Sequence, residues 1–196
     1  MRNISLQLQP LRAADRPVYE SLYESSFPAS ERKELDYMIT GERASAYEVL
    51  RISTPAVRVA GMVITVTHGD LTMLDYFAVS PDLRGQGIGH AVLPLIRDRV
   101  RERGGGHFFL EIETPPPLCI LRDPCANPEQ RARRKAFYLS AGLVETGVRA
   151  FIYGNDMELL AFPEDAEAIT FDGYDTLLKA TFPKGMGAER FDPNSS

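Results

Sequence analysis

The sequence has no long apolar run, no excess of basic residues and only two cysteines. No segment approaches the roughly 20 apolar residues that a membrane-spanning helix needs, and Met1 to Pro10 lacks the apolar stretch of a signal peptide. With 22 basic and 27 acidic residues, the formal net charge is -5, which argues against a surface that neutralises nucleic-acid phosphates or anionic lipids. We therefore expect a cytoplasmic protein whose partner is a small molecule, with neither nucleic acid nor a membrane bound.

The two cysteines, Cys119 and Cys125, lie in a proline-rich stretch. The sequence contains no second cysteine pair, and the nearest histidine upstream is His107. This pattern favours free thiols in a reducing compartment over a disulfide or a metal site, so we expect no metal cofactor.

The chain of 196 residues is long enough to bury one core of ordinary size, and it contains no internal repeat. Its apolar spacing alternates between helix and strand periods. Helices are expected from about residue 14, from about residue 30, and over 86–103 and 129–141. Strands are expected at 4–10, 46–52, 57–67, 71–79, 108–113, 143–153 and 157–162. The stretch from Thr114 to Pro128 is too rich in proline for either element and is expected to form an exposed loop.

We divide the chain into a domain over 1–163 and a C-terminal extension over 164–196. The extension contains one apolar cluster, Tyr174 to Phe182, followed by an unpatterned polar end. It is expected to pack on the domain or on a neighbouring subunit, which would make the protein a homodimer. Its last residues are expected to be mobile.

The segment from Leu74 to Gly89 is predicted to run from a strand through a tight turn into a long helix. The N–H groups that begin a helix are unpaired and carry a partial positive charge, so an anion placed there gains hydrogen bonds and favourable electrostatics. Glycines at 85, 87 and 89 remove side chains that would hold the anion away and permit unusual backbone angles. The turn therefore suits a pyrophosphate, although a lone glycine triplet is about as often a loop without a ligand.

Two familiar nucleotide-binding loops do not fit this turn. Its spacing, Gly-x-Gly-x-Gly, differs from the Gly-x-Gly-x-x-Gly of dinucleotide folds, and the Gly-Lys-Ser/Thr of nucleotide triphosphatases is absent. Arg84, Gly87 and Gly89 instead match Arg/Gln-x-x-Gly-x-Gly/Ala, the acetyl-CoA motif of the GCN5-related N-acetyltransferase (GNAT) family. The preceding Phe77 to Pro81 resembles the strand end of that family, and the order of elements from residue 4 to about 162 is similar to its layout.

The resemblance implies an α/β (α+β) fold with a mixed, mostly antiparallel central sheet of six to seven strands flanked by about four helices. It also implies an N-acetyltransferase that uses acetyl-CoA as co-substrate and a primary amine as acceptor, with direct attack in a ternary complex. In the family, the amides of this turn hold the pyrophosphate and the preceding strand pairs with the pantetheine arm. We carry cofactor binding over to Phe77, Val79, Arg84, Gly85, Gln86, Gly87, Ile88 and Gly89.

A second match to the family is Phe137 to Leu143, in which Leu143 replaces the usual phenylalanine. The resemblance assigns to Tyr138 the role of the acid that protonates the departing thiolate. An unperturbed phenol, with a pKa of about 10, is protonated at neutral pH and can serve as that acid. Two positions depart from the family: Arg131 stands where many members have an asparagine that contacts pantetheine, and Pro94 is expected to bend the cofactor helix.

The acceptor amine must lose a proton before it attacks a thioester. Glu111 and Glu113 lie on one face of their predicted strand, which is expected beside the cofactor strand, and Glu111 is the first candidate for the base. Asp75 is a weaker candidate. The alternative is that both glutamates only hydrogen-bond loop or arginine groups. A cluster of acids would also favour a cationic acceptor.

The basic run on the helix predicted over 129–141 has two interpretations. Arg131, Arg133, Arg134 and Lys135 form either a solvated helix face or a contact with the 3′-phosphate of the cofactor, which salt would weaken. We assign neither.

Two other functions are compatible with the glycine turn. A non-catalytic acyl-CoA-binding or sensing module would keep the turn yet release no thiol with any amine. A purely structural turn would not be stabilised by coenzyme A at all. The presence of Tyr138 favours catalysis over both.

Overall fold

The structure is a computed structural model that describes residues 5–119, 127–152, 154–183 and 187–190. The chain divides into two compact units: the first comprises Met1–Thr67 and Leu74–Gly104, and the second comprises His68–Met73 and Gly105–Ser196. The mobile end expected after residue 190, and residues 120–126 of the expected proline-rich loop, lie outside the described residues.

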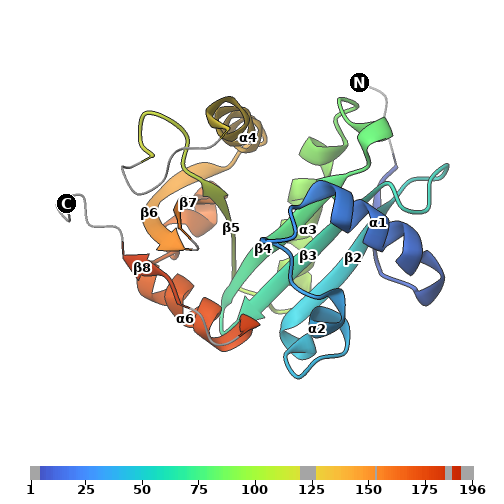
Figure 1. The fold of residues 1–196 in the computed structure, drawn as a ribbon, viewed down its shortest axis with the longest axis horizontal. Helices are drawn as coiled ribbons and strands as arrows, with labels where there is room; N and C mark the ends of the chain where they lie inside the picture. Colours follow the sequence, from blue (N-terminus) through green and yellow to red (C-terminus); the bar gives the residue numbers. More distant parts are fainter. Residues whose placement is uncertain (1–4, 120–126, 153, 184–186, 191–196) are drawn as a thin grey trace. The chain divides into compact units, whose positions relative to one another are not determined.

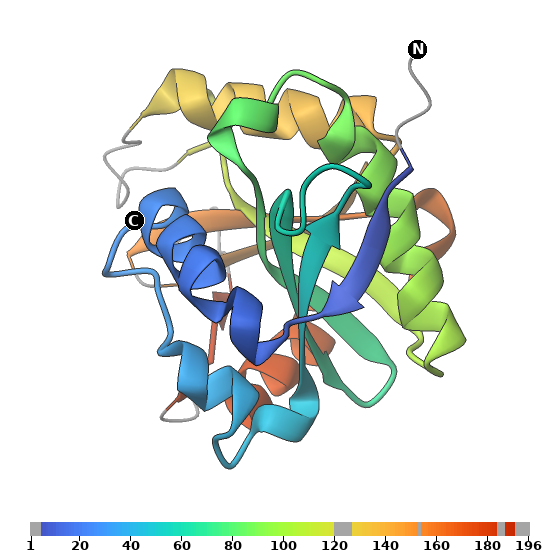
Figure 2. The same ribbon diagram turned by 90° about the vertical axis from the view of Figure 1, so that its right-hand side faces the viewer.

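The first unit is built on four strands with helices on both faces. The strands follow one another in the order β1 (Gln7–Pro10), β2 (Tyr47–Ser53), β3 (Gly61–His68) and β4 (Leu71–Val79). β1 pairs antiparallel with β2, and β2 with β3; the two residues between β3 and β4 make the expected hairpin. α1 (Arg16–Ser26) and α3 (Ile88–Glu102) lie on opposite faces of these strands (Figure 1, Figure 2).

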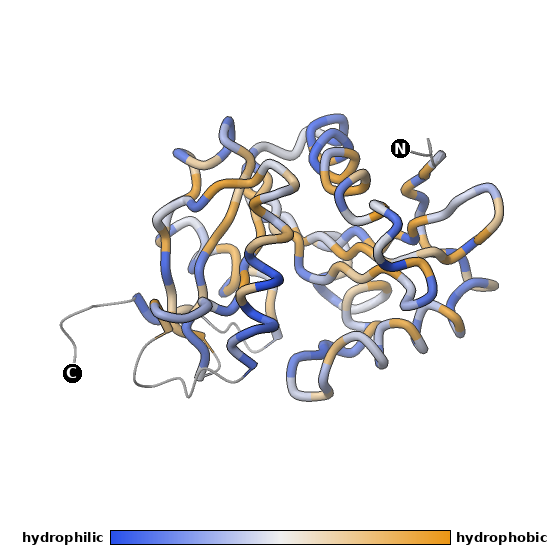
Figure 3. The backbone as a smooth tube through the Cα atoms, turned by 90° about the horizontal axis from the view of Figure 1, so that it is seen from above, coloured by the Kyte–Doolittle hydropathy of each residue, from blue (hydrophilic) through white to orange (hydrophobic). Residues whose placement is uncertain are grey.

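Apolar side chains hold these helices to the strands. Along α3, Ile88, Val92, Leu93, Ile96 and Val100 are buried, which is the stripe that a helix facing a sheet on one side requires. Hydrophobic and hydrophilic segments accordingly alternate within single helices (Figure 3). Because helices cover both faces, β3 is buried from Gly61 to Val66 and does not alternate between buried and exposed residues. Pro94 lies inside α3, which continues to Glu102; the bend expected there stays a prediction.

The second unit contains the remaining strands in the order β5 (His107–Glu113), β7 (Asn155–Ala161), β6 (Val144–Ile152) and β8 (Glu189–Arg190). All three neighbouring pairs are antiparallel, with a register shift in β6 between Glu145 and Arg149. Its helices are α4 (Pro128–Ser140), α5 (Pro163–Ala166) and α6 (Phe171–Thr181). Phe108, Phe109, Leu160, Tyr174 and Leu177 are fully buried, so residues beyond 163 share the core of this unit.

The expected fold class is confirmed: the described residues form a mixed α/β fold with mostly antiparallel strand pairs. They contain eight strands and six helices rather than six to seven strands and about four helices. The additions come from the extension, where α5 and α6 form, and where β8 pairs with the end of β6. A two-residue strand carries no periodicity that a sequence pattern could reveal. Among the described residues, no helix combines the length and apolar character needed to cross a membrane.

Two expected elements are shorter than their patterns indicate. The strand expected over 57–67 begins at Gly61, because Thr54 and Val57 close a turn before it. The N–H of Thr54 donates to the Val57 carbonyl oxygen, and the N–H of Val57 donates to the Thr54 hydroxyl oxygen. The helix expected from about residue 30 is limited to α2 (Leu35–Ile39), because two tyrosine hydroxyl groups hold the backbone from Glu31 to Lys33. Tertiary hydrogen bonds override the helical pattern there.

Candidate active site

The turn after β4 is closed by the arginine of the predicted motif. A short 3-10 turn over Pro81–Leu83 follows the strand, and α3 begins at Ile88. The Nε–H of Arg84 donates to the carbonyl oxygen of Val79 at 3.0 Å. Arg84 therefore folds back onto the end of β4 and fixes the path of the chain into the glycine segment.

Gly85 and Gly87 adopt backbone angles that favour glycine. Their φ angles are +74° and +81°, in the left-handed region where an L-residue with a Cβ loses about 1–2 kcal/mol. A Cβ built on either residue would meet no protein atom within 4 Å. The space beside both glycines is therefore open, and a ligand can approach the main chain there.

The same turn leads directly into the main-chain N–H groups at the start of α3. Gly87 is the N-cap residue of α3, a helix of 15 residues, and the N–H of Ala91 bonds the Gly87 carbonyl at 3.1 Å. The N–H groups of Ile88 and Gly89 precede this first helical bond and lie where the helix dipole is positive. The segment Arg84–Gly87 is exposed. Open space, main-chain donors and positive potential fit a pyrophosphate.

Phe77 and Val79, the residues predicted to pair with the pantetheine arm, are half-buried on β4. They alternate with buried Tyr76 and Ala78. A Cβ on Gly61 would lie 2.6 Å from the Ala78 carbonyl oxygen, so glycine allows β3 to approach this part of β4 closely.

Asp75, the weaker candidate for the base, forms an ion pair with Lys33. The lysine Nζ lies 2.7 Å from each carboxylate oxygen and 5.0 Å from the centre of the Tyr76 ring. The two side chains are only 8% and 5% exposed. Burial raises the pKa of Asp75, and the charge and hydrogen bonds of Lys33 oppose that rise. In this conformation, Asp75 is engaged by a lysine rather than by solvent.

Tyr138, the predicted acid, lies near the end of α4. Its ring packs against the Phe137 ring with centroids 5.0 Å apart. Burial raises the pKa of Tyr138 to about 12, while the positive charge of Arg134 acts in the opposite direction. The phenol therefore remains protonated throughout the neutral range, as an acid requires.

Glu111 on β5 accepts a short hydrogen bond from the hydroxyl of Tyr174 on α6. Tyr174 is fully buried, and its ring packs edge-on against Phe109 at 6.1 Å. In the sequence, Tyr174 belongs to an apolar cluster, and no pattern there identifies it as a partner of a candidate site residue. Its spacing on an amphipathic helix carries no signal for a hydroxyl that reaches a strand 63 residues earlier.

Glu113 is held between two arginines of α4. Each of its oxygens lies 3.0 Å from a guanidinium nitrogen, one of Arg131 and one of Arg134. Arg131 is 1% exposed and also donates to the Thr114 carbonyl at 3.3 Å. Arg131 thus makes a buried ion pair on the inner side of α4, and Glu113 has the arginine contacts that the alternative interpretation anticipated.

The rest of the basic run is divided between core-facing and solvent-facing positions. Lys135 lies 2.8 Å from Glu158 and 2.6 Å from Glu145. Arg133 is exposed and lies 3.7 Å from Glu129 one helical turn earlier. Of this run, only Arg133 therefore behaves as part of a fully solvated face.

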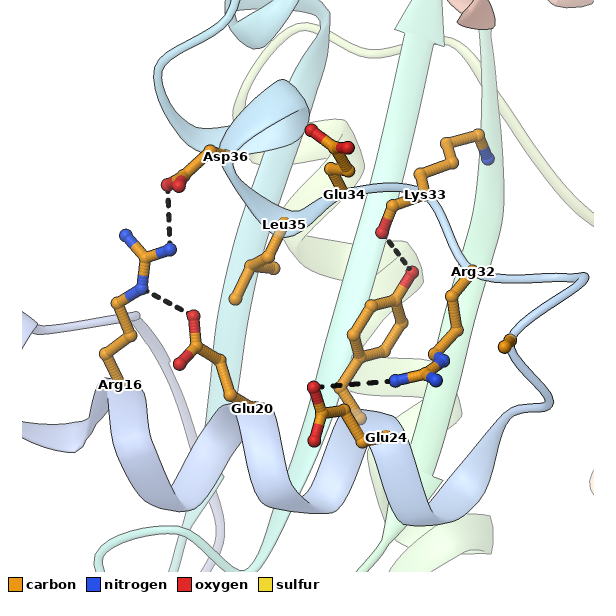
Figure 4. Close-up of a pocket in the computed structure, with 10 residues that line it drawn as sticks. Arg16, Glu20, Glu24, Arg32, Lys33, Glu34, Leu35 and Asp36 are labelled. Carbon is orange, nitrogen blue, oxygen red and sulfur yellow. Dashed lines mark hydrogen bonds and ion pairs between the residues drawn. The ribbon is translucent and has the colours of Figure 1, made fainter.

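A solvent-open pocket of about 400 Å³ lies between α1 and the segment that leads into α2 (Figure 4). Arg16 pairs there with Glu20 and Asp36 at 2.7 Å each. Arg32 lies 3.6 Å from Glu24. Figure 4 shows that the side chain of Lys33 extends away from the other labelled residues. The pocket is therefore lined by charges that are largely paired with one another.

Cys119 is disulfide-bonded, so the expectation of a free thiol at this position is wrong. Cys125, the other cysteine of the sequence, lies outside the described residues. Within the described part of the chain, no group of three or more histidine, cysteine, aspartate or glutamate side chains is arranged to hold a metal ion.

The fold and the glycine turn are those of an acetyltransferase, and comparison with known proteins identifies the family. Residues 16–116, just over half of the chain, match the model of the acetyltransferase (GNAT) family. The protein belongs to the GNAT family. No curated protein matches the sequence.

Solved structures share the fold at low sequence identity. A GNAT-family protein from Bacteroides thetaiotaomicron is 22% identical with a TM-score of 0.61, over 80% of this chain and 86% of that one. The ribosomal-protein-S18-alanine N-acetyltransferase from Escherichia coli is 23% identical with a TM-score of 0.51, over 81% and 94%. The spermidine N-acetyltransferase from Vibrio cholerae, in complex with CoA and spermine, is 14% identical with a TM-score of 0.58, over 82% and 97%.

The predicted site residues are distributed over both units. The cofactor-binding residues, from Phe77 to Gly89, all belong to the first unit, where they form the end of β4, the turn and the start of α3. The predicted catalytic residues Tyr138, Glu111 and Glu113 all belong to the second unit. Their roles remain predictions, and their joint action belongs to the proposal that follows.

Proposed function

We propose that the protein is an N-acetyltransferase that transfers the acetyl group of acetyl-CoA to a primary amine by direct attack in a ternary complex. The observation that carries the proposal is the turn from Arg84 to Gly89, where an exposed glycine segment, open space beside Gly85 and Gly87, and a helix N-terminus coincide. The CoA bound by the Vibrio cholerae relative and the N-acetyltransferase activity in the names of two relatives support it.

Each part of this chain has a distinct task in the proposal. The N–H groups of the turn hold the pyrophosphate, and the backbone at Phe77 and Val79 pairs with the pantetheine arm. The amine nitrogen bonds to the acetyl carbon, the bond from that carbon to sulfur breaks, and Glu111 accepts the proton of the amine directly or through a water molecule. Tyr138 gives its proton to the departing thiolate and recovers one from solvent.

Glu111 is preferred to Glu113 as the base because their surroundings differ. Both oxygens of Glu113 are engaged by arginine guanidinium groups, so protonation would disrupt two ion pairs. Glu111 is half-buried and has a tyrosine hydroxyl as its partner, a neutral donor. Glu113 is retained as a second candidate.

The small amines that the Vibrio cholerae relative is named for support a small, cationic amine as acceptor. A homodimer, the cytoplasm as location and the absence of nucleic-acid and membrane partners remain part of the proposal. The extension over 164–196 is proposed to belong to the same functional unit as residues 1–163.

The test is a thiol-release screen with acetyl-CoA across amino acids, polyamines, aminoglycosides and peptide N-termini, with Tyr138→Phe run beside the wild type. The proposal expects turnover of at least one primary amine by the wild type and a large loss in the variant. Thermal melting with coenzyme A gives a second readout. Stabilisation by coenzyme A with no turnover of any amine would instead favour the non-catalytic acyl-CoA-binding module.

A further inference from the structure

Lys33 belongs to the loop between α1 and α2, yet its ammonium group is buried against β4. Three features of its surroundings are those of a receptor for a primary ammonium ion. Both carboxylate oxygens of Asp75 accept from Nζ, the face of the Tyr76 ring lies beneath it, and little of either charged side chain is exposed. A carboxylate and an aromatic face together recognise alkylammonium ions.

The aromatic ring of this site is held rigidly. Tyr23 and Phe27 of the α1 end pack edge-on against Tyr76, with centroids 4.9 Å and 5.0 Å away. The hydroxyl of Tyr76 accepts from the Lys33 main-chain N–H at 3.0 Å and donates to the Glu31 carbonyl at 2.7 Å. The receptor is thus positioned by main-chain contacts that do not involve the Lys33 ammonium, and it persists when the ammonium is removed.

Stability alone does not account for a buried pair of this kind. The free-energy cost of removing two charges from water offsets most of their attraction. An apolar pair of similar volume would therefore stabilise the fold equally well. The position of Asp75 suggests another use. It lies four residues before Val79, about 13 Å along β4, on the strand that the proposed function pairs with the pantetheine arm.

We infer that Asp75 and the Tyr76 ring form the subsite for the ammonium group of the acceptor, and that Lys33 occupies it as a tethered surrogate in the resting protein. That the bound ammonium ion is the acetyl acceptor rests on the proposed function. A primary alkylammonium ion displaces Lys33 and takes over both hydrogen bonds to Asp75. A quaternary ammonium ion has no N–H group and cannot replace those bonds.

The first test uses Lys33→Ala, which removes three side-chain carbons and the nitrogen, the same number of carbon and nitrogen atoms that propylammonium contains. Propylammonium chloride is expected to raise the melting temperature of Lys33→Ala in a concentration-dependent way. In wild type, the tethered lysine competes for the subsite, so the shift at equal concentration is expected to be smaller. Tetramethylammonium chloride at equal ionic strength is the matched salt control. The double variant Lys33→Ala/Asp75→Asn is expected to lose the response.

Equal responses of wild type and Lys33→Ala, or a response that survives in the double variant, would overturn the inference. If Lys33→Ala is unfolded in buffer, propylammonium is expected to restore the native circular dichroism, and failure to do so counts equally against the subsite. Because these measurements need no acetyl-CoA, they remain decisive even if coenzyme A does not stabilise the wild type and the proposed function fails.

The kinetic test uses the amine that turns over in the thiol-release screen. A tethered lysine competes at an effective concentration in the millimolar range, so Lys33→Ala is expected to lower the KM for the amine about tenfold and leave the KM for acetyl-CoA unchanged. Lys33→Arg keeps a cation in the subsite and is expected to retain the high KM. A KM for the amine that is the same in all three proteins would refute the surrogate role.

Discussion

Replacing Gly87 with alanine tests whether the turn after β4 is a ligand site or only a tight corner. Gly87 has a φ of +81°, and a Cβ there would meet no protein atom within 4 Å. Gly104 supplies a matched control, because its φ is +76° and its Cβ would also meet nothing. Gly104 follows the other end of α3, far along the helix from the turn. The two substitutions therefore impose the same backbone strain at different places.

The strain is about 1–2 kcal/mol for an alanine in the left-handed region. In a chain of this size, each 1 kcal/mol corresponds to a decrease in melting temperature of about 2–4 °C. Gly87→Ala and Gly104→Ala are therefore expected to melt at similar temperatures, each a few degrees below wild type. Neither variant should lose cooperative unfolding, since no side chain has to move.

Binding of coenzyme A is expected to separate the two variants. In Gly87→Ala, the new methyl group projects into the space where the pyrophosphate approaches the main chain, and losing one hydrogen bond to a charged group costs about 1.5–3 kcal/mol. This converts to a decrease in affinity of about 10- to 100-fold, measured by isothermal titration calorimetry. Gly104→Ala should bind as tightly as wild type. Equal affinities for the two variants would refute the assignment of the turn as the phosphate site.

Three further predictions concern the second unit. Tyr138→Phe is expected to lower kcat about 10²- to 10⁴-fold with an unchanged affinity for coenzyme A; a kcat equal to that of wild type would remove Tyr138 as the acid. Because burial raises the pKa of Tyr138 to about 12, the phenol stays protonated as pH rises, and the pH–rate profile should show no decline between about pH 7 and 10 from loss of this acid. Glu111→Gln is expected to lower kcat. Glu113→Gln is expected mainly to lower the melting temperature, because it weakens the ion pairs to Arg131 and Arg134. If Glu113→Gln lowered kcat and Glu111→Gln did not, the two roles would be exchanged.

The features that the sequence predicted correctly are those encoded by short, local patterns. Most of the apolar stripe on α3 and the hairpin of β3 and β4 follow from periodicity and turn residues that lie side by side in the chain. Leu95, which the helical spacing also placed in the stripe, is instead 39% exposed, and Leu93 is buried. The spacing of Arg84, Gly87 and Gly89 is local in the same way, so the family and the fold class could be predicted from it. The left-handed angles at Gly85 and Gly87 are the physical reason that glycine is needed there.

The features that the sequence did not predict depend on contacts between distant residues. Lys33 and Asp75 are 42 residues apart, and their pairing changes a candidate base into the partner of a lysine. Arg131 and Glu113 are 18 residues apart, and their pairing places a second candidate base in contact with a buried arginine. The disulfide at Cys119 was not anticipated either, since two cysteines in an isolated pattern gave no sign of their bonding.

The C-terminal extension expected after residue 163 supplies part of the core of the second unit. Within the apolar cluster recognised in the sequence from Tyr174 to Phe182, Tyr174, Leu177 and Leu178 of α6 are fully buried in the second unit. The Tyr174 ring covers Phe109 of β5, and its hydroxyl is the donor to Glu111. Removal of the extension would therefore expose an aromatic core residue and deprive the first candidate for the base of its partner. Because α6 places the Tyr174 hydroxyl against the Glu111 carboxylate, this helix is better regarded as part of the candidate site than as a separate C-terminal extension.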